Sequence, residues 1–164
     1  RLPFQKFILD RYDIRYRFMQ KGEEAKVCSI VKKVFNEFVA QDYEEEGINE
    51  FFKFANPLAL ADRAGSEQVV IVAEQGSDLV GIIEMSNCDH IAMLFVSLRS
   101  KGIAKELINR AVEKCRRRKP ELKRITVNSS PFAEPIYSRM GFKPTGSFQK
   151  KNGITFEPMA RDLE

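Results

Sequence analysis

Apolar residues recur along this chain in two spacings, one typical of strands and one typical of helices. Ile14, Tyr16 and Phe18 alternate with arginines, which predicts a strand buried on one face within residues 13–20. Between residues 23 and 40 the apolar residues fall at helical spacing, which predicts the first helix. The same two spacings predict helices at 44–54, 103–119 and 132–140, a weak helix or loop at 58–65, and strands at 68–73, 78–85, 91–96, 124–129, 142–149 and 154–163.

The order of these segments indicates an α/β (α+β) fold. We expect a mixed, mostly antiparallel sheet of about seven strands with helices on both faces. The strands at 91–96 and 124–129 should run parallel, because a crossover helix joins them. No repeat, linker or low-complexity tract interrupts the sequence, so we expect a single domain over residues 1–164.

Residues 94–105 combine the end of a buried strand, a basic turn and the start of a helix. The turn, residues 99–101, reads Arg-Ser-Lys, and it precedes the N–H groups and positive dipole of a helix N-terminus. Gly102 and Ala104 leave the backbone open to a ligand, because neither carries a bulky side chain. The stretch therefore predicts an anion site suited to phosphates, and an ordinary strand-turn-helix with solvated cations is the alternative.

Two motifs in the second half of the sequence resemble those of the GNAT superfamily of acyl-CoA-dependent N-acetyltransferases. Residues 99–104, Arg-Ser-Lys-Gly-Ile-Ala, are similar to the Arg/Gln-x-x-Gly-x-Gly/Ala signature of that family. Ala133, Tyr137 and the pair Gly141-Phe142 match the spacing of its second motif, Asn-x-x-Ala-x-x-x-Tyr followed by Gly-Phe. The order of the predicted elements agrees with the family as well.

The resemblance implies that the two central parallel strands splay apart. In that family the free backbone of the first strand binds the pantetheine arm of acetyl-CoA, and the turn that follows binds the pyrophosphate. Residue by residue, the resemblance assigns the cofactor to Leu94, Phe95, Val96, Arg99, Ser100, Lys101, Gly102, Ile103, Ala104, Lys105, Asn128, Ser130 and Tyr137. Ser130 stands where the family usually has Asn, and Asn128 lies nearby, so either residue is a candidate for that contact. A helix cap is the simpler role for Ser130, and it is compatible with binding.

Tyr137 is similar to the family's tyrosine that donates a proton to the departing CoA thiolate. A phenol suits this role, because it is neutral at pH 7 and can act as a positioned donor. The alternative is a tyrosine that only packs in the core.

Glu84 and His90 are the candidates for the general base, which must take a proton from the acceptor ammonium group. The unperturbed pKa of a histidine, about 6.5, already suits the task. Glu84 would need apolar surroundings to raise its pKa toward neutrality. We prefer Glu84, because a carboxylate that interrupts an apolar strand is costly unless something compensates for it. Without a catalytic role, Glu84 would face solvent or pair with an arginine, and His90 would bond to backbone in a turn.

Composition excludes several other classes of protein. The formal net charge of +4 comes from 27 Lys and Arg against 23 Asp and Glu, with both signs interspersed, so we expect no nucleic-acid partner. Cys28, Cys88 and Cys115 are far apart and odd in number, and His90 is the single histidine, so we expect no metal site and a cytoplasmic location. No apolar run approaches the length of a membrane span, so we expect no membrane partner.

The expected activity is the transfer of acetyl from acetyl-CoA, the co-substrate, to a primary amine of a small molecule or protein. The reaction would proceed by direct attack in a ternary complex of a monomer or homodimer. A non-catalytic GNAT-like module that only binds acyl-CoA is the competing hypothesis. Polyamines, aminoglycosides, amino acids and protein amines all stay open as acceptors.

Overall fold

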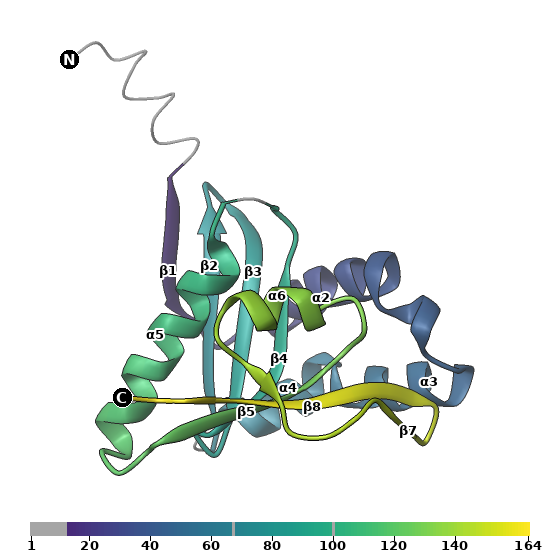
Figure 1. The fold of residues 1–164 in the computed structure, drawn as a ribbon. Coiled ribbons are helices and arrows are strands. Elements are labelled where there is room, and N and C mark those ends of the chain that lie inside the picture. Colours follow the sequence, from purple (N-terminus) through teal and green to yellow (C-terminus); the bar gives the residue numbers. More distant parts are fainter. Residues whose placement is uncertain (1–12, 67, 100) are drawn as a thin grey trace, which may run out of the picture.

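A mixed β-sheet forms the centre of the molecule in the computed structural model, which describes residues 13–66, 68–99 and 101–164 (Figure 1). The strands of the described chain follow the order β1-β2-β3-β4-β5-β8-β6 across the sheet, and β7 pairs with β8 in addition. Their bounds are β1 (Ile14–Phe18), β2 (Val69–Gln75), β3 (Asp78–Ser86), β4 (His90–Val96), β5 (Arg124–Ser129), β6 (Lys143–Pro144), β7 (Gln149–Lys151) and β8 (Ile154–Asp162). All pairings are antiparallel except that of β4 with β5.

Helices cover both faces of this sheet, which confirms the expected fold class (Figure 1). They are α2 (Glu24–Phe38), the short 3-10 helix η1 (Ala40–Asp42), α3 (Glu45–Phe54), α4 (Pro57–Ala64), α5 (Ile103–Arg118) and α6 (Glu134–Arg139). One apolar cluster joins α5 to the sheet, and a second joins α2 and α4 to the opposite face. The helix at α4 resolves the choice between helix and loop, because Asn56 caps it by accepting a hydrogen bond from the Ala59 N–H at 3.0 Å.

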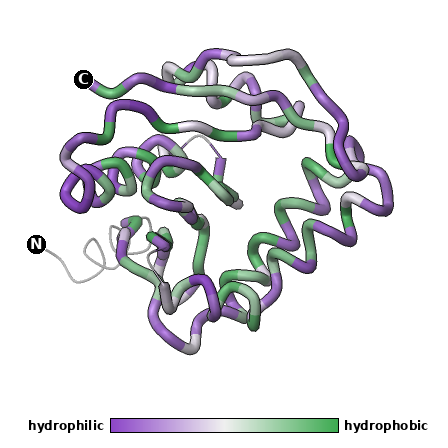
Figure 2. The backbone as a smooth tube through the Cα atoms, turned by 90° about the horizontal axis from the view of Figure 1, so that it is seen from below, coloured by the Kyte–Doolittle hydropathy of each residue, from purple (hydrophilic) through white to green (hydrophobic). Residues whose placement is uncertain are grey.

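Apolar side chains concentrate between the helices and the sheet. Figure 2 shows hydrophobic and hydrophilic positions alternating along the helices. Gly81 on β3 lets α5 approach closely, since a Cβ there would lie 3.1 Å from the side chains of both Ile103 and Leu107. The crossover helix is therefore held tightly over the middle of the sheet.

The two parallel strands separate soon after they meet. In the described chain β4 pairs with β5 at only two places, His90 with Thr126 and Ile91 with Val127. Beyond that point β4 continues to Val96 along β3, and β5 pairs with β8 on its other side. One edge of β4 is thus left without a strand partner over its second half.

The closing part of the chain differs from the sequence prediction. Instead of one strand over 142–149, the structure forms β6 and β7, two short strands that both pair with β8. Pro144 ends β6 because proline has no N–H for the ladder. The following turn brings Gly146 so close to Pro158 that a Cβ would lie 3.0 Å from its ring. Helix α6 also begins two residues later than predicted, at Glu134.

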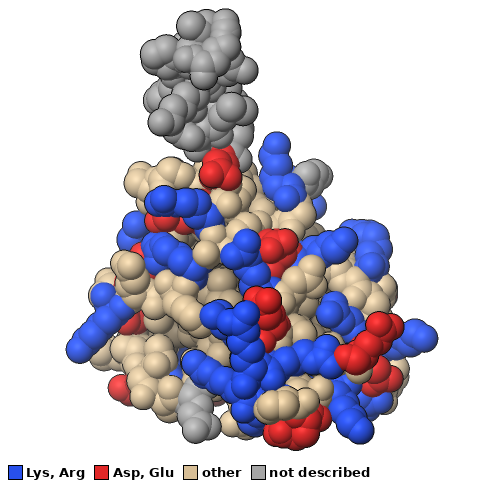
Figure 3. Space-filling view, turned by 90° about the vertical axis from the view of Figure 1, so that its left-hand side faces the viewer, with Lys and Arg blue, Asp and Glu red and all other residues tan. Residues whose placement is uncertain are grey.

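Lys and Arg side chains gather on the face that carries β1 and α5, with Asp and Glu side chains among them (Figure 3). Ion pairs join Arg110 to Glu106 at 2.7 Å and Arg124 to Asp162 at 2.9 Å on the surface. No described helix is both long and apolar enough to cross a bilayer. Within residues 13–66, 68–99 and 101–164, no group of three or more His, Cys, Asp or Glu side chains is placed to hold a metal ion.

Candidate active site

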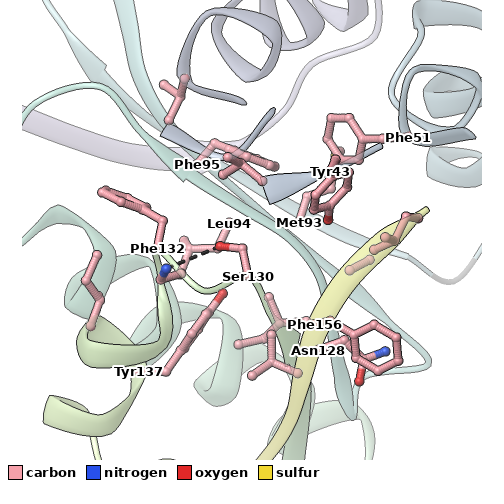
Figure 4. A pocket seen from close by; sticks show the side chains of 18 of the residues that line it. Tyr43, Phe51, Met93, Leu94, Phe95, Asn128, Ser130, Phe132, Tyr137 and Phe156 are labelled. Carbon is pink, nitrogen blue, oxygen red and sulfur yellow. Dashed lines mark hydrogen bonds between the residues drawn. The ribbon is translucent and has the colours of Figure 1, made fainter. Parts of the chain in front are cut away.

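A cavity of about 460 Å³ lies where β4 and β5 separate (Figure 4). Its lining residues come from helix α2 and the segment after it, from α3, β4 and β5, from the start of α5, from the segment through α6, and from the β7–β8 hairpin. They are Val34, Val39, Tyr43, Phe51, His90, Ile91, Ala92, Met93, Leu94, Phe95, Val96, Ala104, Val127, Asn128, Ser130, Phe132, Ala133, Ile136, Tyr137, Lys151, Asn152, Ile154 and Phe156. We call the lining residues within 94–99, 101–104 and 128–137 the motif wall, and Tyr43, Phe51 and the lining residues within 151–156 the hairpin wall.

Residues 94–96 bring a free strand edge to the motif wall. Leu94, Phe95 and Val96 line the cavity, and their β3 partners occupy the other edge of β4. Backbone N–H and C=O groups on the free edge therefore lack a partner strand and can bond to an extended ligand that carries amide groups. The sequence prediction placed the cofactor along this edge.

The start of α5 follows this edge directly. Gly102 adopts a left-handed conformation with a φ of +69°, and a Cβ built there would meet no atom within 4 Å. Ala104 lines the cavity, and the lysines at 101 and 105 are exposed beside it. Ile103 packs in the core under α5, so it can offer a ligand only its backbone. Ser100 lies outside the described residues.

Arg99 takes part in an aromatic cluster that the sequence did not predict. Its guanidinium carbon lies 4.1 Å from the ring centre of Phe38 and 5.0 Å from that of Phe132. The two rings stack on each other at 4.7 Å. This cation–π contact links the end of α2 to the segment after β5 and holds the arginine beside the cavity.

Tyr137 lies on the motif wall with its hydroxyl directed into the cavity (Figure 4). Only 5% of the residue is exposed, and its ring makes an edge contact with Phe142 at 5.3 Å. Burial raises the pKa of Tyr137 well above the ordinary value, because the phenolate would lose its hydration. The phenol therefore stays protonated at neutral pH and is available as a proton donor.

Asn128 and Ser130 both lie on the cavity wall, two residues apart at the end of β5. The Ser130 hydroxyl oxygen accepts a hydrogen bond from the Ala133 N–H at 3.2 Å (Figure 4). Ser130 therefore stabilises the turn before α6 instead of capping the helix as expected, because the N-cap residue of α6 is Ala133 and no side chain caps it. Both residues remain candidates for a cofactor contact.

His90 begins β4 and lines the cavity. Its Nδ1 lies 2.7 Å from the Thr126 hydroxyl oxygen, which itself lies 3.4 Å from the Asp89 carbonyl oxygen. Burial lowers the pKa of His90 below its ordinary value, and the nearby Asp89 carboxylate opposes the shift. The imidazole is therefore neutral at pH 7 and able to accept a proton.

Glu84 occupies a different environment from the one expected. It is fully buried, and its carboxylate accepts hydrogen bonds from Arg63 at 2.8 and 3.1 Å and from Gln68 at 2.9 Å. Arg63 also lies over the Phe54 ring at 3.6 Å and donates to the Phe54 carbonyl oxygen at 2.8 Å. Glu84 is not among the lining residues, so the structure does not bring it together with His90 and Tyr137. The compensation that the strand carboxylate requires comes from an ion pair that joins α4 to the sheet.

The hairpin wall was not predicted as part of the site. Phe51 stacks on Phe35 at 4.2 Å, and Tyr43 meets the same ring edge-on at 5.2 Å. Ile154 and Phe156 are two positions apart on β8, so their side chains lie on the same face of the strand and both reach the cavity. The richness of the segment 35–54 in phenylalanine was the one sequence signal that pointed toward this wall.

A close contact between Gly47 and Gly153 joins the two segments that form the hairpin wall. Asn152 and Gly153 form the two-residue turn between β7 and β8, with φ values of +52° and +78°. The Glu44 N–H donates to the Gly153 carbonyl oxygen at 2.9 Å, and Lys150 pairs with the Glu44 carboxylate at 3.1 Å. A Cβ at Gly153 would lie 2.6 Å from the Gly47 nitrogen, and one at Gly47 would overlap the Gly153 carbonyl oxygen. The start of α3 therefore docks on the hairpin through bare backbone.

The model of the acetyltransferase (GNAT) domain family matches residues 39–163 of this chain. No curated protein of similar sequence was found. Three solved structures with similar folds are a GCN5-related N-acetyltransferase from Rhodopseudomonas palustris, the PaiA N-acetyltransferase from Thermoplasma acidophilum in complex with coenzyme A, and a GNAT-family acetyltransferase from Staphylococcus aureus Mu50.

Sequence identity to these three structures is low, at 21%, 18% and 15% in the same order, with TM-scores of 0.77, 0.73 and 0.72. The alignments cover 91%, 92% and 93% of this chain, and 95%, 99% and 100% of the other chains. The similarity of fold therefore extends over about nine tenths of this chain.

Proposed function

Since the chain belongs to the GNAT acetyltransferase family, we propose that it binds acetyl-CoA and transfers the acetyl group to a primary amine by direct attack in a ternary complex. The observation that carries this proposal is the free edge of β4, which runs into the open start of α5 with Tyr137 on the same cavity. A thioester supplies the activated acetyl group, and the chain supplies orientation and proton transfer.

The motif wall would hold the cofactor. Backbone groups of residues 94–96 face the cavity without a strand partner, which suits the two amides of a pantetheine arm. The N–H groups at the start of α5, with Arg99 and the exposed lysines at 101 and 105, suit a pyrophosphate. An N–H of the free edge can also donate to the oxygen that becomes negative during attack.

Tyr137 would donate a proton to the sulfur as the thiolate leaves. Its hydroxyl points into the cavity, and its raised pKa keeps the proton on the oxygen at neutral pH. The same burial excludes water from competing as a donor.

His90 would take a proton from the acceptor amine, directly or through a water molecule. When the Thr126 hydroxyl donates to the Asp89 carbonyl oxygen, Nδ1 of His90 must donate to Thr126. That arrangement leaves the lone pair on Nε2, so the histidine is prepared as a base. The Glu84 carboxylate is already hydrogen-bonded to Arg63 and Gln68, and we therefore prefer His90 as the general base.

A broad amine screen tests the proposal against the alternative of a module that only binds acyl-CoA. Acetyl-CoA is mixed with the protein and each amine, release of free CoA thiol is followed, and acetylated product is identified by mass spectrometry. We expect at least one amine to be acetylated in a protein-dependent way. Tight CoA binding by calorimetry without any transfer would instead establish the binding module.

A further inference from the structure

The hairpin wall is strongly apolar at the end of the cavity that lies away from α5. Tyr43, Phe51 and Phe156 supply aromatic surface there (Figure 4). Val34 and Val39 of the α2 region add aliphatic surface to the cavity lining. Phe35 supports the aromatic side chains from behind, stacked on Phe51 at 4.2 Å. A ligand group that fills this end must therefore be apolar, because only apolar contacts are offered there to offset the free energy of the hydration that it loses.

The side chains that line the cavity carry charge of one sign only among the described residues. Among the described lining residues no carboxylate occurs, and Lys151 on the rim is the side chain that carries a full charge at neutral pH. Glu44, close to this end, is engaged with Lys150 at 3.1 Å. Glu157 is buried but lies outside the lining, because it alternates along β8 with Phe156, whose side chain reaches the cavity.

We propose that the acceptor is a small primary monoamine with an apolar body, aromatic or aliphatic, and that the cavity discriminates against amines with a second positive charge. This inference rests on the proposed acetyltransferase function and names its substrate class. The juxtaposition that carries it is the aromatic hairpin wall with Lys151 at its rim and no lining carboxylate in the described chain.

The discrimination follows from the fate of each amino group. The attacking ammonium group loses its proton to the base before transfer, so it is neutral when it reacts. A second ammonium group would stay charged inside the cavity, without a carboxylate to replace its hydration and with Lys151 as a like charge. Burial of such an unpaired charge is strongly unfavourable. Polyamines and aminoglycosides should therefore be poor acceptors.

The sharpest test uses hexylamine and 1,5-diaminopentane, which differ only in that a terminal methyl group of one replaces an ammonium group of the other. We expect kcat/KM for hexylamine to exceed that for the diamine by about tenfold or more, as for burying an unpaired charge. 2-Phenylethylamine should be at least as good as hexylamine, because its ring can pack against Tyr43 and Phe51. Binding of the same amines to the CoA-loaded protein is measured by calorimetry.

The variant Lys151→Glu sharpens the test by placing a carboxylate at the rim. We expect the preference for hexylamine over the diamine to narrow several-fold, because the second ammonium group gains a partner. Lys143→Glu is the matched control, since Lys143 is also an exposed strand lysine but does not line the cavity, and it should leave the preference unchanged.

The outcomes separate this inference from the proposed function. A diamine acetylated as well as or better than hexylamine overturns the inference and leaves the acetyltransferase function intact. Failure of hexylamine, 2-phenylethylamine and the diamine alike overturns the inference, and the proposed function fails with it only if no amine of the broad screen is acetylated. If the preference for hexylamine is unchanged in Lys151→Glu, Lys151 does not contribute to the discrimination, and the apolar wall alone accounts for it.

Discussion

The motif wall comes from two short stretches of sequence, whereas the hairpin wall comes from segments about a hundred residues apart. Lys150 and Glu44, which hold the hairpin wall together, are 106 positions apart. The motif wall offers mainly backbone groups, which any extended ligand with amides and phosphates can use. The hairpin wall offers side chains, chiefly aromatic ones. This contrast separates a wall suited to a common cofactor from a wall suited to a particular acceptor.

His90 lines the cavity but belongs to neither wall, and its replacement should have the largest effect. We expect His90→Gln to lower turnover by roughly a hundred- to ten-thousand-fold, because loss of a positioned base has that effect. The neutral imidazole is the active form, so kcat/KM of the native protein should fall as pH drops through the pKa of His90, which burial holds below its ordinary value. The pH profile of kcat/KM measures this acidic limb, and the limb should vanish in His90→Gln.

Glu84→Gln is the control for that experiment. It should keep the acidic limb, since Glu84 bonds to Arg63 away from the cavity lining. It should nevertheless lower the free energy of unfolding by about 3 kcal/mol, because it leaves the partly buried guanidinium of Arg63 without its carboxylate. If the limb instead disappears in Glu84→Gln and survives in His90→Gln, the base is the glutamate. If both variants keep it, neither residue is the base.

Tyr137→Phe tests the chemical role of the motif wall. It keeps the ring and removes the proton, so turnover should fall by roughly ten- to ten-thousand-fold, as expected for a lost general acid. CoA affinity, measured by calorimetry, should barely change. Tyr43→Phe removes a hydroxyl from the hairpin wall instead and should leave the thiol-release step intact. If Tyr137→Phe and the native protein have equal turnover while the chemical step is rate-limiting, Tyr137 only packs in the core.

Gly102→Glu tests whether the open start of α5 binds phosphates. The variant places a negative side chain at the helix N-terminus, so we expect CoA affinity to fall by about tenfold or more through repulsion of like charges. Gly76→Glu is a matched control, because Gly76 also has a positive φ, +61°, with nothing within 4 Å of a built Cβ. Both variants carry the same backbone strain, so a loss of CoA binding in Gly102→Glu alone, measured by calorimetry, isolates the anion site. Equal affinity in both variants would place the pyrophosphate elsewhere.

The motif wall could be predicted because its determinants are local in sequence. The family resemblance that residues 99–104 and Ala133, Tyr137 and Gly141 carry is enough to indicate the strand edge, the helix start and the tyrosine. The elements themselves follow from periodicity, and α2, α5 and β5 agree with the prediction within one or two residues. Local sequence patterns were thus enough to predict the sheet, the crossover helix and one half of the cavity, the motif wall.

The other half could not be predicted because it depends on contacts between distant residues. The sequence left open whether Glu84 serves catalysis or pairs with an arginine, and the structure bears out the pair. No local pattern identifies Arg63 and Gln68 as the partners, so catalysis was preferred. Asn-Gly at 152–153 is a typical turn sequence, but nothing in the sequence indicates that this turn docks on Gly47. Periodicity indicates which face of an element is buried and says nothing about which distant segment covers it.

Gly47→Ala tests the hairpin wall and should have the smallest effect on catalysis. The added Cβ overlaps the Gly153 carbonyl oxygen, so the start of α3 must move away from the hairpin and carry Tyr43 with it. We expect kcat/KM for the acceptor to fall about three- to tenfold, because a small displacement of a positioning wall weakens orientation, while CoA affinity stays unchanged. The free energy of unfolding should fall by about 1–3 kcal/mol, the usual cost of overpacking. Gly65→Ala, whose nearest neighbours lie at 3.6 Å or more, is the control and should change neither. If Gly47→Ala weakens CoA binding as much as acceptor use, the two walls do not act separately, and the contrast between them fails.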